Sequence, residues 1–247
     1  MRHPAGESRN SHAVVVRLIH DLPMFRRIAS EHLAELVASA RTQHLRRGEV
    51  LQRRGERIPG LYAVVYGTLK LSLRGPNGEE KVLRLIGRAE TLGEAALFLD
   101  KPVPVEVVAL SDAMVVLIPG PPLLALLERA PTFARGLLAS LCQRLHELVV
   151  DFESTTLHGA LERVAGYLDS LAEPGDGPAK FRLPASKTVI AARLGMTKET
   201  LSRLLRQLRQ EALITVAGQE ITLLDRARVE AIAHGAPLSP TGSAPPA

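Results

Sequence analysis

The segment from Lys198 to Leu208 constrains the fold of this chain most strongly, because its leucines recur on one face of a predicted helix. At about 100° per residue, four leucines occupy one arc, and four polar or charged residues occupy the opposite arc. The leucines are Leu201, Leu204, Leu205 and Leu208, and the opposing residues are Glu199, Ser202, Arg203 and Arg206. Such a helix packs its apolar face on a domain and leaves its charged face for a partner.

The stretches around this helix predict a winged helix-turn-helix. Before it, ASKTVIAARLG predicts a two-turn helix that ends at Gly195. After it, ITVAGQEITLLD predicts a hairpin around Ala217–Gln219, and RARVEAIAH predicts a closing helix. LHGALERVAGYLDS predicts a helix at the start of the unit, followed by a short strand at 181–184. Helix, glycine turn, helix and hairpin together define this DNA-binding motif, which we assign to residues 157–234.

The residue types on the exposed face suit duplex DNA. Arginine donates two hydrogen bonds to guanine, glutamate accepts from cytosine, and serine does either. Segment 186–211 holds six Lys/Arg against two Glu, a balance of +4 in a chain of net charge +5. Such cations neutralise phosphates. The predicted DNA contacts are Lys187, Thr197, Lys198, Glu199, Ser202, Arg203 and Arg206.

Residues 18–121 predict a domain built around a β-roll. Between Arg47 and Pro119, short β-rich runs alternate with glycine, and the PNG at 76–78 is a hairpin signal. Several short strands at this spacing indicate a small antiparallel barrel or roll. Residues 18–40 predict a helical lead-in, with Ser30 as N-cap. We expect residues 1–17 to be a flexible N-terminus and residues 235–247 a disordered tail.

Residues 122–156 predict a long helix. Five large apolar side chains recur along it at alternating spacings of three and four, which is typical of a seam between paired helices. The predicted dimer interface comprises Leu138, Leu141, Leu145, Leu148 and Phe152. The alternative is an amphipathic helix that lies on its own domain.

Composition narrows the class of protein. The one cysteine, Cys142, excludes an internal disulfide and a Cys-ligated iron–sulfur cluster within one chain. We expect it to pack as a small apolar residue at the flank of the seam. The longest uncharged stretch, 113–127, is broken by prolines, and no secretory signal is visible, so we expect a cytoplasmic protein without a membrane partner. No metal site is predicted.

The whole pattern resembles the cAMP receptor protein/fumarate-and-nitrate-reductase regulator superfamily of bacterial transcription factors. The resemblance covers roughly residues 18–232, and it rests on GEVLQRRGE with LYAVVYGTLKL, LGEAALF at 92–98, and AARLGMTKETLSRLLRQL at 191–208. It implies an α+β fold with an N-terminal antiparallel β-roll sensor domain, a long dimerisation helix and a C-terminal winged helix-turn-helix domain. It also implies a homodimer that binds duplex DNA, is not an enzyme and has RNA polymerase as a partner. The hairpin Gly75–Glu80 either touches the polymerase or is a plain exposed turn.

The resemblance also bears on the signal. Cyclic-AMP binders in this superfamily carry Gly-Glu and, about ten residues later, Arg-Ser. Gly93 and Glu94 are candidate effector-pocket residues here, but the later positions are Pro104 and Val105. Without that arginine the cyclic phosphate loses a charge-assisted contact, so we expect no cAMP response and a structural role for Glu94. The cysteine cluster of the oxygen-sensing branch is absent, so no iron–sulfur cluster is expected.

Within the superfamily, the sequence most resembles the nitric-oxide-responsive, denitrification-type branch, in the segments NGEEKVLRLI and EAALFLDKP. That branch makes haem a candidate cofactor, with His20 and His44 as the histidines near the roll, although both also fit surface positions. The sequence identifies neither the cofactor nor the signal.

The run from Glu199 to Arg203 matches the E-T-x-S-R pattern of the oxygen- and nitric-oxide-type branches. The resemblance therefore implies palindromes built on TTGAT…ATCAA, although Lys198 departs from the flanking pattern. Two alternatives remain: a cyclic-nucleotide-responsive regulator of the cAMP type, and a ligand-binding module whose C-terminal domain engages a protein. An enzyme on a β-roll has no support, because the chain shows no Walker string, no HExxH and no catalytic Cys–His pairing.

Overall fold

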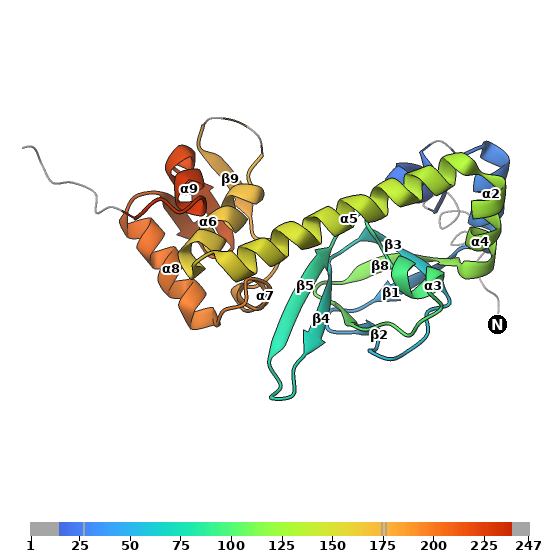
Figure 1. Cartoon of the computed structure of the whole chain (residues 1–247), viewed down its shortest axis with the longest axis horizontal. Coiled ribbons are helices and arrows are strands. Elements are labelled where there is room, and N and C mark those ends of the chain that lie inside the picture. Colours follow the sequence, from blue (N-terminus) through green and yellow to red (C-terminus); the bar gives the residue numbers. More distant parts are fainter. Residues whose placement is uncertain (1–14, 27, 174, 176, 239–247) are drawn as a thin grey trace, which may run out of the picture. The chain divides into compact units, whose positions relative to one another are not determined.

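The computed structural model describes residues 15–238, except 27, 174 and 176. The chain divides into two compact units, residues 1–147 and residues 148–247, which are described separately. Figure 1 gives the element labels used below. In the part of the chain that the structure describes, no helix is both long and apolar enough to cross a bilayer.

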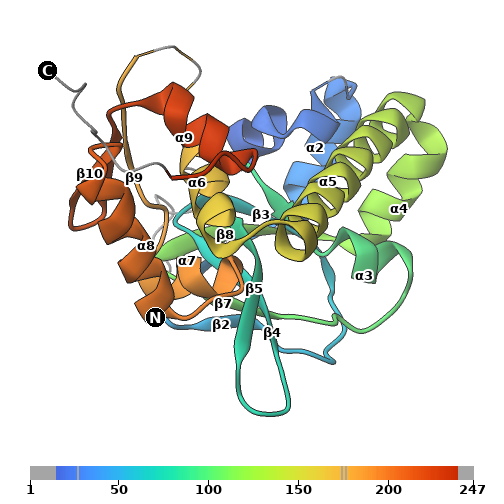
Figure 2. The ribbon, with the colours of Figure 1, turned by 60° about the vertical axis from the view of Figure 1, so that its left-hand side comes forward.

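The first unit is a β-roll of two four-stranded sheets, seen from two sides in Figures 1 and 2. One sheet has the strand order β1-β8-β3-β6 and the other β2-β7-β4-β5, with antiparallel pairing throughout. The strands are β1 (Arg41–Leu45), β2 (Val50–Gln52), β3 (Gly60–Tyr66), β4 (Leu69–Arg74), β5 (Glu80–Ile86), β6 (Thr91–Leu92), β7 (Glu106–Ala109) and β8 (Ala113–Pro119). The predicted roll is confirmed. The short helix α3 (Glu94–Phe98) follows β6.

The β4–β5 hairpin projects beyond the other strands of the roll (Figures 1 and 2). Its turn closes through a hydrogen bond from the Gly78 amide to the Gly75 carbonyl, as the PNG signal predicts. Below the turn, Lys70 Nζ lies 2.5 and 2.7 Å from the two carboxylate oxygens of Glu80, and Ser72 donates to the same carboxylate at 2.8 Å. The two strands are therefore tied together by charge.

This cluster predicts an acid-sensitive hairpin. Burial by itself raises the pKa of Glu80, but hydrogen bonds from Lys70 and Ser72 and the charges of Lys70 and Arg74 outweigh it, so the pKa lies below its ordinary value of 4.5. The stabilisation is therefore complete above that ordinary value and is lost as the pH falls through the lower folded value. We expect Glu80→Gln to unfold at lower urea concentration than the wild type at pH 7. The difference should shrink below pH 4, and a difference independent of pH would contradict the assignment.

The lead-in expected to be helical over 18–40 contains two helical stretches separated by a short 3-10 turn. Residues 15–21 are helical, a 3-10 turn η1 spans Pro23–Phe25, and helix α2 spans Ser30–Ser39. Pro23 cannot continue a helix, which explains the interruption. The N-cap of α2 is Ala29 and not Ser30, and it has no side-chain cap. The other expected flexible residues, 1–14, and the tail from 239 lie outside the described residues, whereas 235–238 are described.

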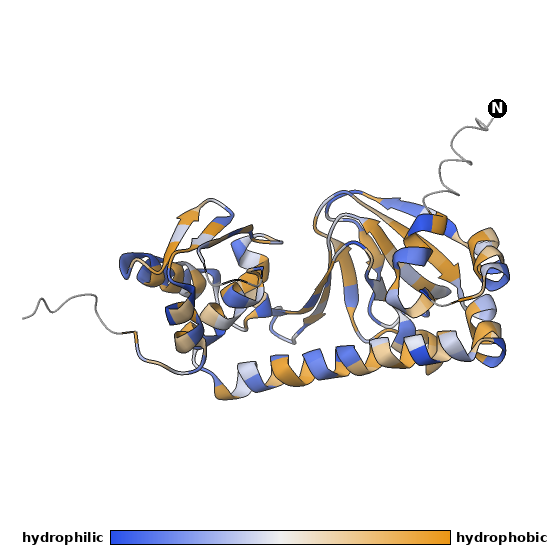
Figure 3. Ribbon diagram, turned by 90° about the horizontal axis from the view of Figure 1, so that it is seen from above, coloured by the Kyte–Doolittle hydropathy of each residue, from blue (hydrophilic) through white to orange (hydrophobic). Residues whose placement is uncertain are grey.

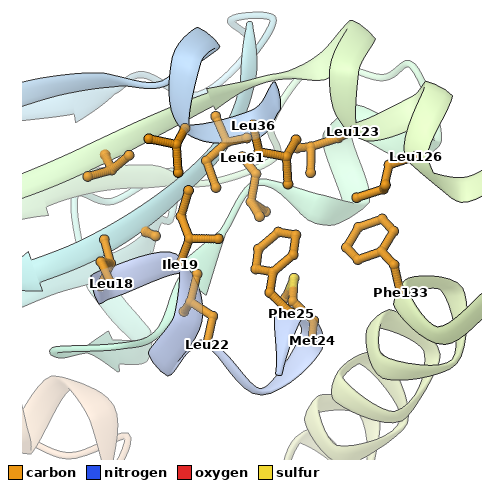
Figure 4. Close-up of a cluster of buried hydrophobic side chains, with 14 of the residues drawn as sticks. Leu18, Ile19, Leu22, Met24, Phe25, Leu36, Leu61, Leu123, Leu126 and Phe133 are labelled. Atoms are coloured by element: carbon orange, nitrogen blue, oxygen red, sulfur yellow. The ribbon is translucent and has the colours of Figure 1, made fainter. Parts of the chain in front are cut away.

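The long helix expected over 122–156 is two helices, α4 (Gly120–Arg129) and α5 (Pro131–Leu157). The residue before a proline is disfavoured in the helical region, and the backbone of Ala130 is not helical (φ −129°, ψ 86°). Phe133 at the start of α5 stacks on Phe25, with ring centroids 5.1 Å apart. Figure 4 shows the cluster that results, in which α4 and the first turns of α5 contribute to the core of the β-roll unit. The first compact unit therefore continues past the predicted boundary at 121 and includes α4 and α5 as far as residue 147.

The second unit carries the predicted winged helix-turn-helix. Its helices are α6 (Ala160–Ser170), α7 (Lys187–Arg193), α8 (Lys198–Gln210) and α9 (Arg226–Ala233). Its three-stranded sheet has the order β10-β11-β9, from β9 (Ala179–Arg182), β10 (Ile214–Ala217) and β11 (Glu220–Leu223). The hairpin turn falls at Gly218 and Gln219, as predicted. The unit begins at Leu148, so it includes residues 148–156 of α5, which the predicted boundary at 157 leaves out.

Candidate DNA interface and sensor site

Helix α8 has the two faces that its periodicity predicts. Leu201, Leu204, Leu205 and Leu208 are all buried in the second unit. The helix begins at Thr197, whose hydroxyl accepts a hydrogen bond from the Thr200 amide at 3.2 Å. Because the N-cap and the leucine face fix the helix, its polar face is held rigidly toward solvent.

The side chains on that face are available to a ligand. Lys198, Glu199, Arg203 and Arg206 are exposed, and Ser202 is half-buried. Within the described residues, Glu199, Arg203 and Arg206 take part in no ion pair or side-chain hydrogen bond. Lys187, the first residue of α7, is half-buried, and Thr197 acts as the N-cap. All seven predicted contacts therefore lie in or next to α7 and α8.

Two arginines that the sequence reasoning did not place hold this motif to the end of α5. Arg163 on α6 donates to the carbonyls of Leu194, in the turn between α7 and α8, at 3.0 Å and of His158 at 2.7 Å. Arg193 on α7 forms an ion pair with Asp151 on α5 at 3.2 Å. Arg193 was counted among the basic residues of segment 186–211, but its charge is neutralised. Leu194 and Asp151 lie 31 and 42 residues from these arginines in the chain, so no local pattern reveals those two contacts.

The hairpin next to α8 is braced from β9. The guanidinium of Arg182 donates two hydrogen bonds, at 3.2 and 3.1 Å, to the side-chain oxygen of Gln219 at the hairpin tip. Lys180 pairs with Glu220 at 3.1 Å. These contacts fix the hairpin in the position of a wing beside the reading helix.

The candidate effector residues Gly93 and Glu94 have structural tasks. Gly93 has φ +103°, and a Cβ on it would lie 2.2 Å from the side chain of Ile58 and 3.2 Å from the Gly60 carbonyl. Glu94 is only 3% exposed, and its carboxylate accepts from Thr91 and pairs with Arg144 on α5 at 2.5 Å. Glu94 therefore ties the roll to the long helix, and its role as an effector contact stays a prediction.

The positions expected to carry the cyclic-phosphate contact are unsuited to it. Pro104 is exposed and offers no donor, and Val105 packs against the inner core of the roll. The two candidate haem ligands, His20 and His44, are both exposed and lie in different elements. The Nδ1 atom of His44 lies 3.3 Å from the Tyr66 hydroxyl. The described residues show no buried histidine pair that could hold a haem.

Four of the five residues of the predicted seam on α5 are exposed in the single chain, and the seam itself stays a prediction. Leu138, Leu145, Leu148 and Phe152 are all more than half exposed, as an interface in a single chain should be. Leu141 instead packs against the core of the first unit. The exposed stripe runs through Leu138, Cys142, Leu145, Val149 and Phe152, again with spacings of four and three. Figure 3 shows hydrophobic patches recurring along this helix. Cys142 thus lies on the stripe itself and not at its flank.

Comparison with known families supports this architecture. Residues 42–130 match the family described as "Cyclic nucleotide-binding domain", and residues 162–232 match "Crp-like helix-turn-helix domain". The first match covers the roll and α4, and the second covers the elements from α6 to α9. A roll joined to an exposed reading helix defines a DNA-binding regulator with an N-terminal sensor.

Curated relatives narrow this class. The chain is 30% identical over 207 residues to the transcriptional activator protein Anr of Pseudomonas protegens, which covers 82% of this chain and 84% of the relative. It is 28% identical over 213 residues to the cyclic AMP receptor protein of Thermus thermophilus, covering 86% and 97%. The FixK2 structure from Bradyrhizobium japonicum, 23% identical, shares the fold with a TM-score of 0.70 over 80% of this chain and 99% of that one. The chain belongs to the Crp/Fnr family of transcription regulators.

Proposed function

We propose that this regulator is a cytoplasmic homodimer that reads a palindrome of the TTGAT-N4-ATCAA type through Glu199, Ser202 and Arg203. The observation that carries the proposal is the reading face of α8, where Glu199 and Arg203 lie exposed without protein partners above four buried leucines. Two copies joined along α5 would present two such helices to successive major grooves, about 34 Å apart. A signal received by the roll would act by favouring one arrangement of the reading helices over another.

The reading role of Arg203 is tested by substitution. Arg203→Ala should weaken binding to the palindrome by about 1–3 kcal/mol, because a guanine of the site then has no bidentate donor. Binding to random duplex should change much less. Fluorescence anisotropy with both duplexes at one salt concentration measures the difference, and an equal loss on both would contradict base reading by Arg203.

Lys187→Ala is the matched control. A phosphate contact carries no sequence information, so this variant should weaken binding to both duplexes alike and lower the salt dependence of the affinity. If neither the wild type nor either variant binds any duplex, the alternative gains support that the C-terminal domain engages a protein.

We expect cAMP to leave the DNA affinity unchanged, although one relative bears the name of a cyclic AMP receptor. The carboxylate of Glu94 is already paired with Arg144, and Pro104 supplies no positive charge for a cyclic phosphate. Isothermal titration of the purified protein with cAMP tests this expectation. A micromolar or tighter site, or a cAMP-dependent gain in palindrome binding, would favour the cAMP-type alternative.

We propose that the β-roll unit receives a chemical signal whose identity can be tested directly. An absorption spectrum of protein purified with haem available, with and without nitric oxide, tests whether the protein binds haem and responds to nitric oxide.

RNA polymerase is the proposed protein partner, because the exposed β4–β5 hairpin tip at Gly75–Glu80 projects from the roll. A tip deletion that lowers transcription in vitro without lowering DNA affinity would support that contact. We propose that the protein acts by binding and not by catalysis.

A further inference from the structure

The junction between α5 and α6 is short and would be pliable by itself. Helix α5 ends at Leu157 and α6 begins at Ala160, so His158 and Gly159 join them. Gly159 has an extended backbone (φ −65°, ψ 164°), and the atom nearest to a Cβ built on it lies 3.6 Å away in Glu162, so packing does not require a glycine there. Glycine restricts the backbone less than any other residue. The direction of α8 relative to the last turns of α5 therefore depends on contacts that cross this junction.

One guanidinium group joins the junction to the turn that precedes the reading helix. Arg163 on α6 is half-buried, and its Nε donates to the carbonyl of Leu194 at 3.0 Å, while its Nη1 donates to the carbonyl of His158 at 2.7 Å. Leu194 is the C-cap of α7, and Thr197, the N-cap of α8, follows it closely. A planar guanidinium can bridge two carbonyls in a fixed geometry, whereas the ammonium of a lysine is a point charge.

A second contact joins the same turn to α5. Arg193, the neighbour of Leu194, forms an ion pair with Asp151 at 3.2 Å, about two turns before the end of α5. The side chains of Arg193 and Asp151 are 23% and 50% exposed, so water screens the pair only in part. Both residues belong to the second unit. The turn before α8 is thus held both to the junction, at His158, and to the helix that precedes it.

We propose that Asp151, Arg163 and Arg193 are positioning residues for DNA binding, which lock the α5–α6 junction and thereby fix α8 to the last turns of α5. We call these three residues the junction lock. The proposal rests on the DNA binding by α8 proposed above. Without the lock, α8 would sample several directions, and the apparent affinity falls by the fraction of molecules that are not in the binding-competent one. None of the three residues has to touch DNA for this effect.

The lock reverses the expected sign of a charge effect. Residues 148–247 contain eleven Lys/Arg and eleven Asp/Glu, so the DNA-binding unit is neutral overall. Removal of an acidic side chain from this unit should, by charge alone, strengthen its binding to a polyanion. If Asp151 holds the lock, its removal weakens binding instead. The sign of the change therefore separates positioning from electrostatics.

The experiment compares Asp151→Asn with Glu153→Gln by fluorescence anisotropy on the palindromic duplex. Glu153 is exposed on the same helix and, in the part of the chain that the structure describes, makes no ion pair or side-chain hydrogen bond. We expect Asp151→Asn to lose about fivefold in affinity, the upper range for a partly exposed pair, and Glu153→Gln to bind as well as the wild type or better. Asp151→Glu keeps the charge and should stay within twofold of the wild type. Equal or stronger binding by Asp151→Asn would overturn the proposal.

Substitution of Arg163 tests geometry at constant charge. Arg163→Lys keeps the charge but cannot bridge both carbonyls, so we expect it to lose about tenfold in affinity, as Arg163→Gln should. An Arg163→Lys protein that binds the palindrome like the wild type would contradict the bridging role. Sedimentation velocity of the same variants checks the dimer, and a loss of affinity that follows a loss of dimer would also overturn the proposal.

The lock and the proposed operator can fail separately. Wild-type protein that does not bind the palindrome refutes the operator and not the lock. The lock is then measured without DNA, by hydrogen exchange of the backbone amides in the turn over residues 194–197. Exchange there should be faster in Asp151→Asn and Arg163→Gln than in Glu153→Gln, because local opening no longer has to break the contacts of the lock. Equal exchange in all three variants refutes the lock.

Discussion

Arg144→Met should lower the free energy of unfolding of the β-roll unit by about 3–5 kcal/mol, because it leaves the buried carboxylate of Glu94 without its cation. Glu94 is 4% and Arg144 20% exposed in their side chains, so little solvent screens the pair. Methionine keeps most of the apolar length of the arginine, which limits the loss of packing. The loss is measurable as a shift of the urea midpoint followed by circular dichroism.

A second variant distinguishes the unpaired charge from a packing defect. The double substitution Glu94→Gln with Arg144→Met removes both charges, and replacing a buried ion pair as a whole is often close to neutral. We therefore expect the double variant to recover most of the stability that the single variant loses. The assignment fails if Arg144→Met unfolds within about 1 kcal/mol of the wild type, the range of an exposed pair, or if the double variant is no more stable than the single one.

Leu145→Glu should convert the protein from dimer to monomer. Leu145 lies in the middle of the exposed stripe on α5 and is 63% exposed in the single chain. Losing its burial in both copies removes roughly 4 kcal/mol, which is about a thousandfold in the dissociation constant, and two carboxylates placed in an apolar seam add a further cost. Sedimentation velocity over a range of protein concentrations measures the shift.

The matched control is Val150→Glu on the same helix. Val150 is also exposed, but it lies about 140° around the helix from Leu145. It should leave the dimer intact, since its side chain lies off the stripe.

Cys142 adds a chemical test, because it is exposed on the stripe and is the one cysteine of the chain. A mild oxidant should link the wild-type chains in pairs but not the Cys142→Ser chains. A Leu145→Glu protein as dimeric as the wild type would place the interface elsewhere.

Local patterns were sufficient for the elements whose partners lie nearby in the chain. The leucine face of α8, the Gly195 turn, the wing and the β4–β5 hairpin follow from periodicity and turn chemistry, and the structure confirms each of them. The reading face could be named for the same reason. A helix with one wholly apolar arc must bury that arc, so the opposite arc is the surface that remains.

Patterns along the chain were insufficient where a choice depended on distant residues. Leu141 and Cys142 differ by one position on α5, and only the packing of the roll against that helix places Leu141 in the core and Cys142 on the stripe. The sequence analysis expected one helix over 122–156, and α4 belongs to the first unit because Leu123 and Leu126 are buried in the same core as Phe25 and Phe133.

The fold class, the order of the units and the position of the reading helix follow from short-range periodicity and residue chemistry, so they could be predicted from the sequence. The tertiary structure alone decided which charges are free. It brings Arg144 to Glu94 and Arg193 to Asp151 across 50 and 42 positions, and among the described residues it leaves Arg46 and Arg53 without an ion pair, although Glu49 and Glu56 lie three positions away and accept from their backbone amides. A charge is neutralised only by a partner within a few ångströms, and that distance is set by the folded chain and not by position in the sequence.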